Sequence, residues 1–165
     1  MALRLRGSRG RTRHGESIAK SLGYGVLRRQ GKGEIATNAS WDVAVMNGHV
    51  DTAGRALVRI VVTSPTTATA VDIEAWVDTG FTGELVLPQD RIAALGLPRS
   101  AVVKAELGDG SETVLEVYSC LIEWFGHVQQ IEVIANTGTS PLLGIGLLRG
   151  HTLTVDYAAC TLTID

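Results

Sequence analysis

Aromatic residues, cysteines and clustered metal ligands are all scarce in this sequence. Aromatic residues make up 5% of the 165 residues, and there are only two cysteines, Cys120 and Cys160. Neither lies in a paired-spacing motif, so we expect reduced core residues rather than a disulfide or a metal site. The four histidines are scattered, and none has a second ligand at the spacing of a zinc site. No metal or other cofactor is therefore expected.

Long apolar runs are also missing. No stretch approaches the ~20 apolar residues that a membrane-spanning helix requires. The arginines near the N-terminus are not followed by the apolar segment of a secretory signal. These absences lead us to expect a cytoplasmic protein with no membrane partner.

The composition that remains is that of a folded, turn-rich domain. Hydrophobic residues make up 45% of the chain and charged residues 19%, values typical of globular proteins. Nineteen glycines with few aromatics favour a fold of small and branched residues joined by many turns. A length of 165 residues fits one domain.

Charge divides the chain in two. Residues 1–40 carry nine Lys or Arg and two Glu, a net charge of +7, and hold seven glycines without a sustained apolar period. Residues 41–165 carry six Lys or Arg and fifteen Asp or Glu, a net charge of −9. We therefore predict a basic, flexible N-terminal segment over 1–45 and a folded domain over 46–165.

Three interpretations of the basic segment remain open. It can be a solvated tail, or an extension upstream of the true start, since the only other methionine is Met46. It can also be a tether for nucleic acid, because clustered arginines neutralise phosphates without needing a fold. The domain itself gives no sign of nucleic-acid binding, so we expect no such partner for it.

After Met46 the pattern is that of β-strands. Branched residues and period-two alternation predict strands, separated by turn residues, over 56–62, 71–77, 85–87, 102–107, 112–124, 128–135, 152–155 and 161–164. A short helix is predicted over 89–95, with Pro88 at its start and Gly96 at its end. The Asp-Gly pair between the runs at 102–107 and 112–124 predicts a hairpin. A small, mostly β domain with one or two short helices results.

The most informative segment is Trp76–Gly83, where an apolar strand leads into Asp78-Thr79-Gly80. A carboxylate at a strand end is expensive to bury unless it is hydrogen-bonded or paired. A bare Asp-Thr-Gly is more often an ordinary turn than a catalytic site. The longer context therefore decides the interpretation.

That context resembles a known family. The string Asp78–Pro88 is similar to the active-site segment of retropepsin-like aspartic proteases of clan AA, in their prokaryotic single-domain form. Ser140–Gly150 resembles the apolar segment, glycine and short helix near the C-terminus of those proteins. The predicted hairpin lies between them, where the family has its flap. The resemblance covers Met46–Asp165 and implies a single-lobe acid protease fold, a small closed β-barrel-like domain with a flap hairpin.

The resemblance also implies residue roles. Asp78 is the catalytic carboxylate, the Thr79 hydroxyl locks two active-site loops together, and Gly80 allows close approach of the backbone. The three implied groups are catalytic (Asp78, Thr79, Gly80), flap and substrate pocket (Leu107, Gly108, Asp109, Gly110) and active-site scaffold (Leu142, Leu143, Gly144). In this family the residue two after the scaffold glycine often caps or hydrogen-bonds, and Gly146 departs from that pattern. We therefore expect Gly146 to weaken the short helix.

One catalytic aspartate per chain is half of the required pair. The near-matches Asn136-Thr137-Gly138 and Asp51-Thr52-Ala53-Gly54 are better interpreted as turns. A homodimer would supply the second Asp78 across its twofold axis. We expect its interface to use the Asp78–Gly83 loop and the terminal strand Thr161–Ile164, which would otherwise leave an apolar edge exposed.

The leading hypothesis is an aspartic endopeptidase that hydrolyses peptides or proteins with water activated between two Asp78 carboxylates. One alternative is a catalytically weak module of the same fold that binds peptides or dimerises. Another is a nucleic-acid-associated regulator in which the basic segment matters and the β domain only dimerises. The intact Asp-Thr-Gly favours the enzyme, because a pure binder has no use for a paired acid.

Overall fold

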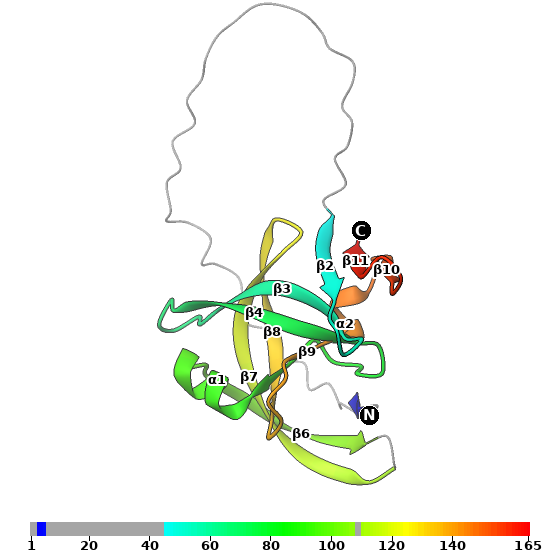
Figure 1. Cartoon of the computed structure of the whole chain (residues 1–165). Coiled ribbons are helices and arrows are strands. Elements are labelled where there is room, and N and C mark those ends of the chain that lie inside the picture. Colours follow the sequence, from blue (N-terminus) through cyan, green and yellow to red (C-terminus); the bar gives the residue numbers. More distant parts are fainter. Residues whose placement is uncertain (1–2, 6–44, 108–109) are drawn as a thin grey trace, which may run out of the picture. The chain divides into compact units, whose positions relative to one another are not determined.

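The computed structural model of the chain describes residues 3–5, 45–107 and 110–165 (Figure 1). Most of the predicted basic segment lies outside these residues, as do Gly108 and Asp109 of the predicted flap. The division at residues 45 and 46 therefore stays a prediction. Three residues of the basic segment, Leu3–Leu5, form a short strand.

The described residues form eleven strands and two short helices, in the mostly β pattern expected from the sequence. In chain order they are β1 (Leu3–Leu5), β2 (Met46–Val50), β3 (Ala56–Thr63), β4 (Ala70–Asp78), β5 (Leu85–Pro88), α1 (Gln89–Leu95), β6 (Arg99–Leu107), β7 (Glu112–Trp124), β8 (His127–Asn136), β9 (Leu142–Gly144), α2 (Ile145–Leu148), β10 (Leu153–Asp156) and β11 (Thr161–Ile164).

Six of the strands close into a barrel. They follow the order β7-β8-β5-β9-β4-β3, and a further pairing of β3 with β7 completes the ring. Two pairs of neighbouring strands in the ring are parallel, β4 with β9 and β5 with β8. The other pairs are antiparallel. The prediction of a small closed β-barrel-like domain with one or two short helices is thus confirmed, and the described residues contain two.

The main hydrophobic core fills the barrel. In β4 the alternation is clear, because Ile73, Ala75 and Val77 are buried while Glu74 and Trp76 are exposed. Every barrel strand contributes to this core, for example through Val58, Ile73, Leu85, Cys120, Val133 and Leu143. Each fully buried Val, Leu or Ile contributes about 1.5–3 kcal/mol of transfer free energy, which makes this core the main source of stability.

A second, smaller cluster lies where the hairpin β6–β7 meets the barrel. It consists of four buried residues, Phe81, Val86, Val117 and Ile134, with the partly buried Val103, Leu115 and Leu142 packed against them. Phe81 comes from the loop after Asp78, while Val103 and Leu115 come from the hairpin. This cluster therefore connects the base of the predicted flap to the segment that carries the predicted catalytic residues.

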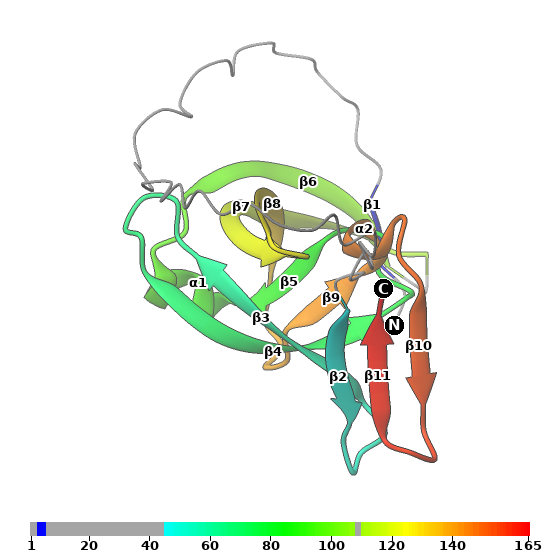
Figure 2. The ribbon, with the colours of Figure 1, turned by 90° about the horizontal axis from the view of Figure 1, so that it is seen from above.

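The terminal strands continue the sheet beyond the barrel. In the order β3-β2-β11-β10, strand β11 lies between β2 and β10 (Figure 2). Leu162 and Ile164 of β11 are almost completely buried in the core of their own chain. The expectation that Thr161–Ile164 leaves an exposed apolar edge is therefore wrong, because β10 follows it in the sheet and is the edge strand among the described residues.

The two cysteines differ in their surroundings. Cys120 is buried in the barrel, where burial and, secondarily, the charge of Glu84 raise the pKa of its thiol to about 12. Cys160 is exposed in the turn between β10 and β11, with a φ of 56°. The expectation of a core role is correct for Cys120 and wrong for Cys160. Both thiols are free.

Candidate active site

Strand β4 carries Asp78 out of the core to the start of a tight turn. Val77 is buried, Asp78 is half-buried and Thr79 is exposed. The backbone N–H of Gly80 donates to Asp78 Oδ1 at 2.9 Å, and the N–H of Phe81 donates to the Asp78 carbonyl at 3.1 Å. The carboxylate is thereby held in one orientation at the surface.

The loop that follows Asp78 is fastened to the segment Gly144–Gly146. Three backbone N–H groups donate across this junction: Gly144 to the Glu84 carbonyl at 2.9 Å, Ile145 to that of Phe81 at 2.9 Å, and Gly146 to that of Gly83 at 2.8 Å. Strand β9 also pairs in parallel with β4, which sets Gly144 opposite Asp78. Two segments about 65 residues apart in sequence thus fix the backbone around Asp78.

Gly144 and Gly146 are both required at this junction by lack of space. A Cβ atom on Gly144 would collide with the carbonyl oxygen of Gly83 and with the ring of Phe81. A Cβ atom on Gly146 would lie 2.6 Å from the Gly83 carbonyl oxygen and 2.9 Å from Cγ of Glu84. Gly146 therefore permits the close packing of α2 against the loop after Asp78. The expectation that Gly146 only weakens the helix missed this role.

The two predicted scaffold leucines face opposite sides. Leu143 is fully buried in the barrel core, beneath the loop. Leu142 is half-buried, packs against the second cluster and lies opposite Trp76 in the β4–β9 register. Trp76 is 40% exposed and, two residues before Asp78, shares its face of β4. The sequence reasoning passed over Trp76, although the period of two already placed it beside the acid.

The predicted flap is described in part. Strand β6 ends at Leu107, whose side chain lies outside the described set together with Gly108 and Asp109. Gly110 is exposed and has a φ of 84°, the left-handed conformation that glycine adopts without strain. The hairpin β6–β7 extends away from the barrel below β4 and β9 (Figure 1).

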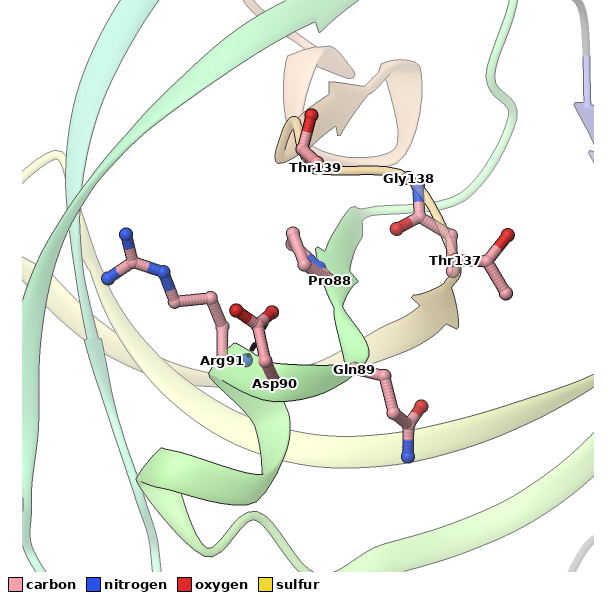
Figure 3. A pocket seen from close by; sticks show the side chains of 8 residues that line it. Pro88, Gln89, Asp90, Arg91, Thr137, Gly138 and Thr139 are labelled. Carbon is pink, nitrogen blue, oxygen red and sulfur yellow. Dashed lines mark hydrogen bonds between the residues drawn. The ribbon is translucent and has the colours of Figure 1, made fainter.

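A separate recess lies beside the start of α1. It has a volume of about 350 Å³ and is lined by the segments 88–91 and 136–139 (Figure 3). Asn136, whose segment resembled the catalytic motif, ends β8 there and leads into bends, as expected of a turn. Its buried Oδ1 has no hydrogen-bond partner among the described residues. Asp78 does not line this recess.

Metal-binding groups are not clustered in the described residues. No set of three His, Cys, Asp or Glu side chains in 3–5, 45–107 and 110–165 is arranged to hold a metal ion. Within the same residues, no helix has the length and apolar character needed to cross a bilayer.

Comparisons with known proteins match this fold to solved structures. No family model and no curated protein matches the chain. A structure described as a retropepsin-like aspartic protease from Rickettsia conorii matches with a TM-score of 0.51 and 18% identity, covering 73% of this chain and 89% of that one. The retroviral protease-like domain of Ddi1 from Leishmania major matches with a TM-score of 0.37 and 18% identity, covering 66% and 88%. With its closed barrel and its Asp-Thr-Gly loop clamped by β9 and α2, this chain has the retropepsin-like aspartic protease fold.

Proposed function

We propose that this protein is an aspartic endopeptidase whose active site forms between two copies of the chain, each supplying Asp78. The observation that carries the proposal is the rigid presentation of Asp78-Thr79-Gly80. The acid is half-buried and hydrogen-bonded to Gly80, and its loop is fastened by backbone bonds to Gly144–Gly146. A turn with only a structural role would not need such a clamp at the end of a barrel strand.

The proposed chemistry needs two carboxylates in contact. Like charges a few ångströms apart do not both ionise, so a pair of Asp78 side chains shares one proton, as is established for aspartic protease dyads. The ionised carboxylate takes a proton from a water molecule, and the oxygen of that water attacks the scissile carbonyl carbon. The protonated carboxylic acid donates its proton to the carbonyl oxygen. When the tetrahedral intermediate collapses and the C–N bond breaks, the carboxylic acid that took a proton from water gives it to the amine nitrogen. The other carboxylate takes a proton from a hydroxyl group of the intermediate, which restores the pair with one shared proton.

The chain leaves two surfaces on which such a dimer can form. Thr79 is exposed beside Asp78, so its hydroxyl can reach the corresponding loop of a partner. Strand β10 has an outer edge with no partner among the described residues. Thr152 and Asp165 exchange two backbone hydrogen bonds, so the alternation of an antiparallel pair directs the N–H groups of Leu153 and Val155 outward. A second β10 can pair with these groups about a twofold axis.

The substrate in this proposal is an extended peptide or protein segment with apolar residues near the cleaved bond. Trp76 and Leu142 lie opposite each other on the face that carries Asp78, and both are partly exposed. An apolar wall beside the acid favours apolar side chains through burial of their surface.

Incubation with a diverse peptide library at pH 4–7, followed by mass spectrometry, tests the proposal. We expect cleavage by the wild-type chain without added metal, and inhibition by statine-type compounds, whose hydroxyl takes the place of the attacking water. The Asp78→Asn variant should leave the library intact. Cleavage by that variant at the wild-type rate would remove Asp78 from the mechanism.

A further inference from the structure

The half-buried side chain of Glu84 lies where three segments of the fold meet. Glu84 ends the loop that begins at Asp78 and directly precedes β5. Its Oε2 accepts a hydrogen bond from the backbone N–H of Glu132 in β8 at 2.7 Å. Its own carbonyl accepts from the N–H of Gly144 at 2.9 Å. Glu84 thus joins the loop to β8 through its side chain and to the end of β9 through its backbone.

The register of β5 and β8 explains why a side chain serves as the acceptor here. The two strands are parallel. Continued by one residue toward the loop, their register would direct the Glu132 N–H to the carbonyl of Gly83. That carbonyl instead accepts from the N–H of Gly146 at 2.8 Å. The Glu84 carboxylate therefore binds the N–H that the ladder leaves over, and the Gly83 carbonyl remains bonded to Gly146.

Glycine at position 146 leaves the space that the Glu84 side chain occupies. A Cβ atom on Gly146 would lie 2.9 Å from Cγ of Glu84, closer than side chains pack. The junction thus has room for one side chain, and it comes from residue 84. The 2.7 Å distance to the Glu132 nitrogen is that of a charge-assisted hydrogen bond, which is stronger than a bond between neutral groups.

We propose that Glu84 is a positioning residue for Asp78. The proposal rests on the proposed function, because it concerns the placement of the acid that takes a proton from water. Without the Glu84 carboxylate, the Glu132 N–H competes with Gly146 for the Gly83 carbonyl and draws the loop toward β8.

Asp78 moves with this loop, because the Phe81 N–H donates to its carbonyl and the Gly80 N–H to its carboxylate. A catalytic group displaced by about 1 Å can slow a reaction by about 10²-fold. Glu84 therefore acts on the reaction through the position of Asp78 and needs no contact with the peptide.

Amide hydrogen exchange of the full chain tests this role without any need for activity. We expect slow exchange at Glu132 and Gly146 in the wild type. Glu84→Ala should speed exchange at both amides by about tenfold, because one bond is lost and the other is shared. Glu84→Gln keeps an acceptor oxygen and should exchange almost as the wild type does. Glu132→Ala removes an exposed carboxylate from the same junction but keeps the backbone N–H, so it is the matched control and should leave exchange at Gly146 unchanged.

Three outcomes of this experiment would overturn the inference. One is unchanged exchange at both amides in Glu84→Ala. Another is faster exchange at Glu132 alone, because the carboxylate would then bind β8 without holding the loop. The third is equal acceleration at the amides shared by β3 and β4, which would assign the effect to general destabilisation.

Cleavage assays separate positioning from peptide binding and from stability. They are made well below the thermal midpoint, at chain concentrations where activity is proportional to concentration, so that dissociation of a dimer does not contribute. Glu84→Ala should lower kcat by about tenfold and leave KM within about twofold, because a displaced acid slows the chemical step. Glu84→Gln should recover about half or more of the wild-type kcat, since its amide oxygen still accepts the Glu132 N–H.

A higher KM or a lower thermal midpoint for Glu84→Ala, at unchanged kcat, would contradict positioning. So would a Glu84→Gln variant as slow as Glu84→Ala, because the hydrogen bond would then not be the cause. If the wild-type chain cleaves no peptide, the proposed enzyme function fails, while the exchange data still decide whether Glu84 holds the loop that carries Asp78.

Discussion

The Asp78–Glu84 loop and the terminal strands differ in how their backbone hydrogen bonds are satisfied. The Asp78–Glu84 loop is completed by its own chain, because Gly144–Gly146 supplies its hydrogen bonds and leaves no room for a side chain on Gly144. The terminal sheet β2-β11-β10 ends on an edge that the described residues leave unpaired. The monomer thus fixes the position of Asp78 by itself, whereas under the proposed function the position of a second Asp78 would depend on a second chain that pairs with that edge.

The largest expected effect is at the acid itself. Asp78→Asn keeps the shape of the side chain and its hydrogen bond from Gly80 but removes the group that accepts a proton from water. We expect peptide cleavage to fall by a factor of about 10²–10⁴ or more, the contribution of a general base. Asp72→Asn, an exposed change on the same strand, is the control and should cleave as the wild type does. Circular dichroism should show the same β content for all three proteins.

The next largest effect concerns the open edge of β10. Val155→Pro removes an N–H that faces away from β11, so the pairing within the chain survives while pairing with a second β10 is impaired. Loss of about one hydrogen bond of ~1 kcal/mol on each side of the twofold axis weakens the dimer about ten- to thirtyfold. Val155→Ala loses more packing but keeps the N–H, and it serves as the control. Sedimentation velocity should show more monomer for Val155→Pro than for Val155→Ala at the same concentration.

A smaller effect is expected where the Asp78–Glu84 loop contacts the segment Gly144–Gly146. Gly144→Ala places a methyl group against Phe81 and the Gly83 carbonyl, and overpacking of this kind costs about 1–3 kcal/mol. The thermal midpoint should fall by about 5–10 °C, with reduced cleavage because the loop is displaced. Gly138→Ala is the matched control, because the nearest atom to its Cβ is a side-chain nitrogen of Asn136 at 3.3 Å. An unchanged midpoint for Gly144→Ala would show that the clamp is looser than its geometry indicates.

These predictions rest on features that the sequence revealed unevenly. The helix Gln89–Leu95 and the strands Glu112–Trp124 and Thr161–Ile164 match their predicted ranges, because alternation, proline and glycine mark them locally. Strand order is not a local property. No pattern within Thr161–Ile164 indicates that β10 pairs with it. The sequence therefore placed the exposed sheet edge at β11, whereas β10 is the strand at that edge.

The candidate site also combines features that the local sequence reveals with features that depend on distant contacts. Asp78-Thr79-Gly80 is recognisable as a string of residues, and so is the apolar segment at Leu142–Gly144. The need for glycine at 146 arises from a contact with Gly83, far away in sequence, and no single-sequence pattern reports such a contact. The pairing of Leu3–Leu5 with β6 was missed for a further reason, since three residues are too few to show a period.

The smallest expected effect lies in the turn between β2 and β3. The Arg55 backbone N–H donates to Asp51 Oδ1 at 2.8 Å and its guanidinium to Oδ2 at 2.7 Å, and these bonds lower the pKa of Asp51 below its ordinary value of 3.8. A lowered pKa stabilises the fold above about pH 4, and this stabilisation is lost as the pH falls through the folded-state pKa. Asp51→Asn should therefore melt slightly below the wild type at pH 7, with the difference shrinking toward pH 2. A constant difference across this range would assign the effect to shape rather than to charge.

The central claim is that one active site takes an Asp78 from each of two chains, and a mixing experiment tests it most directly. Wild-type and Asp78→Asn chains are mixed in equal amounts at fixed total concentration and left to exchange partners before cleavage is measured. Random pairing puts two wild-type chains together in about one quarter of the dimers, so we predict about one quarter of the activity of the unmixed wild type. Activity of about one half, as expected if each chain acts alone, would contradict the two-chain site.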